Sequence, residues 1–227
     1  MRPYTTLSCA ISLDGYLDDT SPQRLVLSNE ADLDRVDQVR ADSDAILVGA
    51  CTLRKDDPRL LVRDERRVQE RLRAGRTASP TKVTVSERAD VDPAARFFTR
   101  GAVDKLVYCG SDGLADAHER IGAVATVIDG GRPVSMEWIC HDLADRGVAR
   151  LLVEGGGMVL TQFLAGGLAD ELHLVVAPFF VGDSGARRFV DAERFAWGPD
   201  SPARLVETRP IDDVVLLRYA LSARCTD

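Results

Sequence analysis

A run of nine residues, Leu152–Leu160, constrains the fold of this chain more than any other stretch. It begins with apolar residues typical of a buried strand, continues through Glu154 into three glycines, and ends in an apolar stretch suited to a helix. Glycines let the backbone approach a ligand closely, and the first turn of a helix offers N–H groups that attract negative charge. The pattern predicts a strand-to-helix junction that can hold a nucleotide phosphate, although the same turn also serves tight packing.

A second segment, Asp44–Arg63, follows a similar plan. A short apolar strand is expected at Ala45–Val48, and it ends at a glycine. Polar residues come next, namely Thr52, Arg54, Asp56, Asp57, Arg59 and Arg63. Because ligands bind beyond the carboxyl ends of parallel strands, the two segments are expected to share one crevice. The alternative is a pair of ordinary loops, in which Asp57-Pro58 marks a turn and the arginines are solvated.

The composition indicates a globular domain. The chain has 227 residues, of which 45% are hydrophobic and 29% charged, and we expect one domain, residues 1–227, with one substantial core. A net charge of −7 argues against a general nucleic-acid binder. No apolar run approaches the roughly 20 residues that a membrane span needs, and the N-terminus lacks a signal-peptide pattern, so a cytoplasmic location without membrane attachment is expected.

Cysteine and histidine usage argues against a structural metal. The five cysteines are scattered without a CxxC pair, and the three histidines are equally dispersed. We therefore expect reduced, mostly buried cysteines and no zinc site. Cys51 is the exception to the expected burial, because it lies in the proposed crevice.

The pattern of the chain predicts an α/β fold. Strands are expected at Tyr4–Leu13, Ala45–Val48, Lys82–Ser86, Lys105–Cys109, Ala123–Ile128, Arg150–Glu154 and Glu171–Ala177. Helices are expected after a cap at Ser28 or Asn29, over Ser135–Arg146 and over Val159–Ala165. The segments Leu205–Arg209 and Val214–Leu221 read as an antiparallel hairpin. Together these elements predict a mostly parallel mixed sheet with a C-terminal antiparallel hairpin, flanked by helices. The arginine-rich segment Arg63–Pro80 is expected to be a solvated excursion.

Three motifs carry a resemblance to a known family. They are SLDG at Ser12–Gly15, the segment Asp44–Arg63, and the segment Leu151–Gly182. In this order and spacing they resemble the reductase of riboflavin biosynthesis, the C-terminal reductase domain of the bacterial bifunctional deaminase/reductase, which has a dihydrofolate-reductase-like fold. The resemblance implies NADPH-dependent reduction of the ribosyl group of a phosphoribosylamino-pyrimidine to a ribityl group, in an enzyme that forms a homodimer.

The resemblance also implies site residues. Substrate contacts are expected from Arg40, Leu60, Arg63 and Glu154. Cofactor contacts are expected from Ile11, Thr52, Asp56, Gly155, Gly156, Gly157, Met158, Val159 and Leu160. The arginines suit a substrate phosphate, the alternative being surface ion pairs. Glu154 is expected to take part in catalysis. Asp14 is expected to help catalysis by orienting groups or by supplying a proton; the alternative is that it is only the turn residue before Gly15.

The residues that follow a third predicted strand indicate which cofactor is used. Ser86 and Arg88 follow the predicted strand at Lys82–Ser86, where a 2′-phosphate could be received, which predicts NADPH over NADH. A solvated Arg88 is the alternative.

The substrate and the function class stay open at this point. Ser8 stands where the bacterial two-domain enzymes usually have a lysine, so the substrate is either 5-amino-6-(5-phosphoribosylamino)uracil or its 2,5-diamino-pyrimidinone precursor. The sequence shows no HxE or PCxxC deaminase signature, so deamination is expected from another protein. Two other functions remain: a reductase of the same fold for another pyrimidine, a pterin or dihydrofolate, and a non-catalytic NADPH-binding protein.

Overall fold

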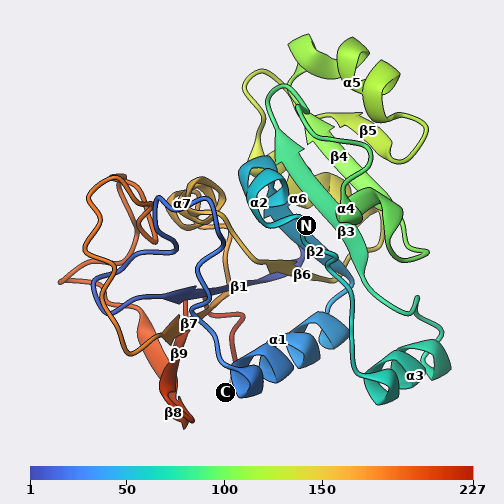
Figure 1. Cartoon of the computed structure of the whole chain (residues 1–227). Coiled ribbons are helices and arrows are strands. Elements are labelled where there is room, and N and C mark those ends of the chain that lie inside the picture. Colours follow the sequence, from blue (N-terminus) through green and yellow to red (C-terminus); the bar gives the residue numbers. More distant parts are fainter. Residues whose placement is uncertain (227) are drawn as a thin grey trace. The chain divides into compact units, whose positions relative to one another are not determined.

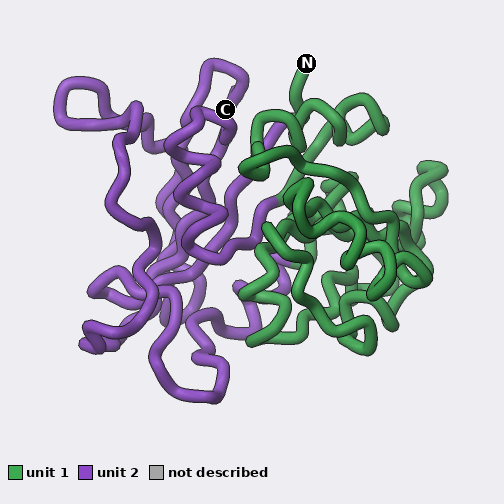
Figure 2. The backbone as a smooth tube through the Cα atoms, turned by 90° about the horizontal axis from the view of Figure 1, so that it is seen from above, with its two compact units in different colours: residues 1–3, 37–152 green, residues 4–36, 153–227 purple. Residues whose placement is uncertain are grey.

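The chain folds into two compact units, which a computed structural model describes over residues 1–226 (Figure 2). Unit 1 comprises Met1–Pro3 and Asp37–Leu152, and unit 2 comprises Tyr4–Val36 and Val153–Asp227. Helices and strands are labelled as in Figure 1. No helix in the described part of the chain combines the length and the apolar character needed to span a lipid bilayer.

Unit 1 is built on parallel strands. They are β2 (Ala45–Gly49), β3 (Thr81–Ser86), β4 (Lys105–Cys109), β5 (Thr126–Asp129) and β6 (Arg150–Val153), which ends at the unit boundary. Their order is β5-β4-β3-β2-β6, and β2 to β5 pair in parallel. All five residues of β2 are buried, as expected for a parallel strand that is covered on both faces.

The helices of unit 1 cover these strands. They are α2 (Ala50–Asp56), α3 (Glu65–Arg73), α4 (Arg96–Thr99), α5 (Leu114–Ile121) and α6 (Met136–Asp145), with a short 3₁₀ turn η1 (Ser111–Gly113). Ser135 caps α6 by accepting a hydrogen bond from the N–H of Trp138, as predicted. Side chains of strands and helices form one apolar cluster, which includes Ile46, Leu53, Phe97 and Ile121.

Unit 2 combines parallel and antiparallel pairing. Strands β1 (Tyr4–Ile11) and β7 (Glu171–Val176) are parallel, β9 (Val214–Ala220) lies antiparallel to β7, and β8 (Arg204–Ile211) lies antiparallel to β9. Helix α7 (Gly157–Ala165) belongs to this unit. Helix α1 (Glu30–Asp42) runs from unit 2 into unit 1 and is capped by Asn29, whose side chain accepts the N–H of Asp32 at 2.9 Å.

The predicted fold class, a mostly parallel mixed sheet with a C-terminal antiparallel hairpin, is confirmed. Strand β4 has the predicted bounds, and the other strands differ from prediction by a few residues at their ends. Part of the polar exit of β2 is helical, since Thr52 and Asp56 lie on α2.

The expectation of a solvated excursion over Arg63–Pro80 is wrong in part. Asp64 caps helix α3 by accepting the N–H groups of Arg66 and Arg67. The side chain of Arg71 is 2% exposed and donates to the carbonyl oxygens of Ala41 and Ser43, each at 2.7 Å, and to that of Thr77. A guanidinium has five N–H donors, so a single arginine satisfies several backbone acceptors that no regular element pairs.

Replacing Arg71 by Met should lower the free energy of unfolding by about 3 kcal/mol, because three buried or partly buried carbonyls lose their donor. Denaturant unfolding of wild type and variant measures this change. Arg73→Met, on the exposed side of the same helix, is the matched control and should cost less than about 0.5 kcal/mol. Equal effects of the two substitutions would contradict the structural role of Arg71.

Candidate functional site

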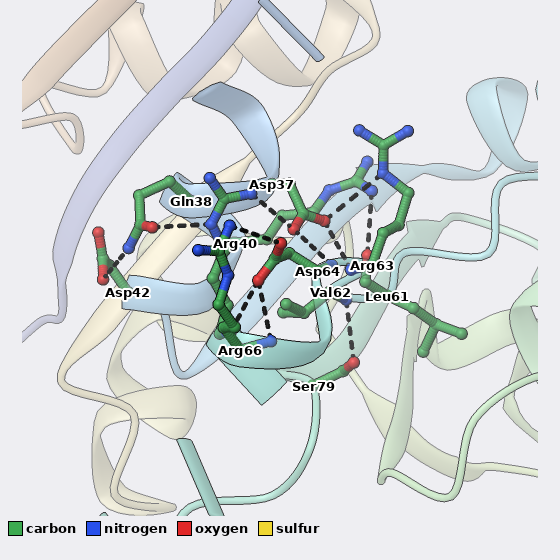
Figure 3. Close-up of polar contacts among 11 residues, drawn as sticks. Asp37, Gln38, Arg40, Asp42, Leu61, Val62, Arg63, Asp64, Arg66 and Ser79 are labelled. Atoms are coloured by element: carbon green, nitrogen blue, oxygen red, sulfur yellow. Dashed lines mark hydrogen bonds and ion pairs between the residues drawn. The ribbon is translucent and has the colours of Figure 1, made fainter. Parts of the chain in front are cut away.

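Three of the predicted substrate residues, Arg40, Leu60 and Arg63, belong to unit 1, and Figure 3 shows Arg40 and Arg63 with their polar contacts. Arg40 is in the last turn of α1, and its Nη1 donates to the carbonyl oxygen of Leu61 at 3.4 Å. Leu61 stands between Leu60 and Arg63 on the segment that leads into α3. Leu60 is buried in the apolar cluster, whereas the Arg63 side chain is 49% exposed. The structure therefore places two guanidinium groups beside one irregular segment.

Asp37 organises this group, and sequence reasoning missed it. Its side chain is 2% exposed and accepts hydrogen bonds from the backbone N–H of Arg63 at 2.7 Å and of Asp64 at 3.1 Å. The one available signal was its spacing, because Asp37 follows the apolar Leu33 by four residues on α1 and so shares its face of the helix.

Other predicted residues of unit 1 lie where strands end. Thr52 and Asp56 are half-buried on α2, directly after β2. Ser86 is the last residue of β3, and Arg88 is exposed two residues later. The pairing register places Ser86 opposite Cys109, and Cys109 opposite Asp129, so the ends of β3, β4 and β5 are aligned.

Two carboxylates accompany Arg88 at this edge, and sequence reasoning did not name them. Glu87 accepts the backbone N–H of Val134, and Asp129 accepts the hydroxyl of Ser111 and the N–H of Gly131. Burial, with the negative charges of Asp129 and Glu87, raises the pKa of the Cys109 thiol. Two negative charges, of Glu87 and Asp129, thus lie near the ends of β3 to β5, where Arg88 follows β3 in the chain.

In unit 2 the glycine-rich junction joins β6 to α7. Glu154 is half-buried directly after the strand, and Gly155 has a φ of +107°, which favours glycine. Helix α7 begins at Gly157 without a hydrogen bond from a capping side chain. The first N–H groups of such a helix suit an anion, so this junction fits the pyrophosphate of a dinucleotide.

The other residues of the junction have separate roles. A Cβ atom on Gly157 would come within 2.9 Å of the carbonyl oxygen of Arg188, so this glycine permits close packing of α7. Val159 and Leu160 are buried, and Leu160 is 0% exposed. Met158 is 48% exposed, which leaves it accessible to a ligand.

Asp14 lies in the turn after β1, which ends at Ile11. Its carboxylate accepts the hydroxyl of Ser12 at 2.5 Å and the N–H groups of Val181 and Gly182 at 3.0 and 2.7 Å. The hydrogen bond from Ser12, supported by those from the two N–H groups, lowers the pKa of Asp14 to about 2. Asp14 is therefore ionised near neutral pH, which favours an orienting role over proton supply.

Comparison with known proteins identifies the family. The model of the RibD C-terminal domain matches residues 3–217. The chain is 35% identical to a protein of Archaeoglobus fulgidus over 86% of this chain and 89% of that protein. It is 34% identical to a protein of Methanothermobacter thermautotrophicus over 85% of this chain and 86% of that protein. Both relatives are named 2,5-diamino-6-ribosylamino-4(3H)-pyrimidinone 5′-phosphate reductase.

Solved structures share the fold. A pyrimidine reductase-like protein of Corynebacterium diphtheriae superposes with a TM-score of 0.80 at 22% identity, over 96% of this chain and 91% of that one. A dihydrofolate reductase of Enterococcus faecalis has a TM-score of 0.51 at 12% identity, over 96% of this chain and 95% of that one. The expected dihydrofolate-reductase-like fold is thereby confirmed, and the family match shows that the chain belongs to the RibD C-terminal domain family.

Proposed function

We propose that this protein is an NADPH-dependent oxidoreductase of riboflavin biosynthesis, which reduces the ribosyl group of a 5-phosphoribosylamino-pyrimidine to the ribitylamino group. The single observation that carries the proposal is the match to two relatives that bear the same reductase name over more than four fifths of each chain. The name also favours the 2,5-diamino-pyrimidinone as the substrate over its deaminated uracil counterpart.

The residues of unit 1 suit a phosphorylated substrate. Arg40 and Arg63 flank the segment that leads into α3, and guanidinium groups bind phosphate through charge-assisted hydrogen bonds worth about 1.5–3 kcal/mol each. We propose that Arg63 and Arg40 contact the phosphate or the sugar that carries it. The side chain of Leu60 is buried in the apolar cluster and anchors the segment, so we propose that Leu60 contacts the substrate through its backbone.

The residues of unit 2 suit the reacting sugar and the cofactor. When bound, the cofactor supplies the hydride that is added to C1′ of the ring-opened imine form of the substrate. Glu154, at a strand end, accepts hydrogen bonds from sugar hydroxyls or from a pyrimidine amino group. Ile11 and the residues from Gly155 to Met158 line the dinucleotide, the N-terminus of α7 faces its pyrophosphate, and the buried Val159 and Leu160 contribute through their backbone N–H groups. The ionised Asp14 orients the turn that follows β1.

The proposal is tested by mixing purified protein with NADPH and one of three candidate substrates while cofactor oxidation is followed by absorbance. The candidates are the diaminopyrimidinone phosphoriboside, the uracil phosphoriboside and dihydrofolate. We expect fastest oxidation with the diaminopyrimidinone, and a product two hydrogens heavier by mass spectrometry. NADPH binding without oxidation would indicate a non-catalytic protein, and oxidation with dihydrofolate alone would indicate a different reductase.

Glu154→Gln should lower kcat/KM by about 10- to 100-fold, because it removes the charge from an acceptor that is worth about 1.5–3 kcal/mol. Steady-state kinetics and thermal unfolding measure activity and folding side by side. Glu119→Gln, an exposed residue of α5, is the control and should change neither. Unchanged kinetics in Glu154→Gln would remove this residue from the site.

Arg88→Ala should weaken NADPH binding by about tenfold or more and leave NADH binding nearly unchanged. Without Arg88, the carboxylates of Glu87 and Asp129 repel a 2′-phosphate, whereas the hydroxyl of NADH carries no charge. Fluorescence titration with each cofactor measures both dissociation constants. Arg66→Ala, which removes an exposed charge from α3, is the control, and equal losses of both cofactors in Arg88→Ala would refute this role.

A further inference from the structure

We propose that Asp37 is a positioning residue for the substrate phosphate. Its buried carboxylate fixes the segment Leu60–Asp64 and thereby holds Arg63 in the orientation that receives this phosphate. The inference rests on the proposed function, in which Arg63 contacts a phosphorylated substrate.

The segment needs an anchor because it lacks regular structure. In the described chain, residues 57–64 belong to no helix or strand, and the N–H groups of Val62, Arg63 and Asp64 donate to side chains instead of to a helix turn or strand ladder. Leu60 has a φ of +48°, a left-handed conformation that costs a residue with a side chain about 1–3 kcal/mol. Such a conformation persists only where the surroundings hold it.

Side chains supply the missing partners one residue at a time (Figure 3). The carbonyl of Leu61 accepts from Arg40, and the N–H of Val62 donates to the hydroxyl of Ser79 at 3.0 Å. The next two N–H groups, of Arg63 and Asp64, donate to Oδ1 and Oδ2 of Asp37 respectively. Asp37 thus holds two consecutive residues, and one of them is Arg63.

Arg67 forms a shorter ion pair with Asp37 than Arg63 does. Nη1 of Arg67 lies 3.0 Å from Oδ2 of Asp37, and its side chain is 16% exposed. The Arg63 contact is longer, with its Nε 3.6 Å from Oδ1, and the Arg63 side chain is 49% exposed. Asp37 therefore directs Arg63 through its backbone, while Arg67 forms the shorter ion pair with the buried carboxylate.

The geometry separates two roles that a simple ion pair would combine. If Asp37 served only to neutralise arginines, Arg67 would be as important as Asp37 for substrate binding. If Asp37 acts through the backbone of Arg63, loss of Arg67 leaves both N–H bonds in place and spares the substrate site.

The test compares Asp37→Asn with wild type on two substrates: the phosphorylated pyrimidine riboside and the same riboside without its phosphate. An amide retains one acceptor oxygen, so one of the two N–H bonds is lost. We expect KM for the phosphorylated substrate to rise about tenfold or more, with kcat within about threefold and the NADPH dissociation constant unchanged. On the riboside without phosphate, variant and wild type should have the same KM.

Three further variants complete the design. Asp42→Asn is the matched control, because Asp42 is on the same helix and its carboxylate accepts only an exposed hydrogen bond from Gln38 among the contacts drawn in Figure 3. Arg67→Gln should leave KM within about threefold. Asp37→Glu keeps the charge but displaces both oxygens by one methylene, so it should also raise KM. This variant replaces Asp37→Asn in the test if Asp37→Asn does not fold.

Two results would overturn the inference in an active wild-type enzyme. They are an equal loss on both substrates, which indicates general damage to the fold, and an unchanged KM in Asp37→Asn and Asp37→Glu. If neither phosphoribosyl-pyrimidine supports NADPH oxidation by the wild-type protein, the proposed function itself is overturned, and the inference with it.

Discussion

Backbone N–H groups outside helices and strands need an acceptor, and in this protein aspartate carboxylates supply it repeatedly. Asp37 accepts from two consecutive residues before α3, and Asp14 accepts from two consecutive residues after β7. Asp44 does the same for Ala149 and Arg150 at the start of β6. The acidic balance of the chain, with 36 acidic against 29 basic residues, therefore has a structural use in joining elements that are remote in sequence.

This use of aspartates links the fold to the chemistry. Several candidate site residues, namely Arg63, Arg88 and Glu154, lie on segments outside helices and strands, and such segments hold a side chain in place only if their own backbone is fixed. In unit 1 the fixed segment carries Arg63, and in unit 2 the turn after β1 is tied to the chain after β7 by Asp14. The carboxylates of Asp37 and Asp14 thus act as acceptors for backbone N–H groups.

Regular elements were predictable from the sequence wherever apolar residues set a clear period. Strand β4 and the C-terminal hairpin follow from runs of β-branched and apolar residues between turn signals. Helix α3 was missed because its sequence, ERRVQERLR, is almost entirely polar, and its stability depends on the cap at Asp64. The burial of Arg71 depends on carbonyls of Ala41 and Ser43, about thirty residues earlier, which no local pattern reveals.

The candidate site was predictable only in part, for a related reason. Arg40 and Arg63 were named from a family resemblance, yet Asp37, which holds the backbone of Arg63, has no motif of its own and gains its role from two N–H groups 26 and 27 residues away. The same holds at the ends of β3 and β5. Arg88 was visible as a cation after a strand, whereas the opposing charge of Asp129 became evident only from the strand register.

The three glycines after Glu154 show how a single motif serves two physical needs. A ligand cradle and tight packing are alternative explanations for such a run in sequence, and the structure shows a backbone requirement at one glycine and a packing requirement at another. Gly155 supplies the positive φ that turns the chain from β6 toward α7. Gly157 removes a side chain that would meet the carbonyl oxygen of Arg188, so the start of α7 packs against the chain that follows β7. A larger residue at Gly157 would displace the helix start, and the anion-attracting N–H groups would move with it. Packing at Gly157 is thus a condition for the cofactor binding that we propose at the start of α7.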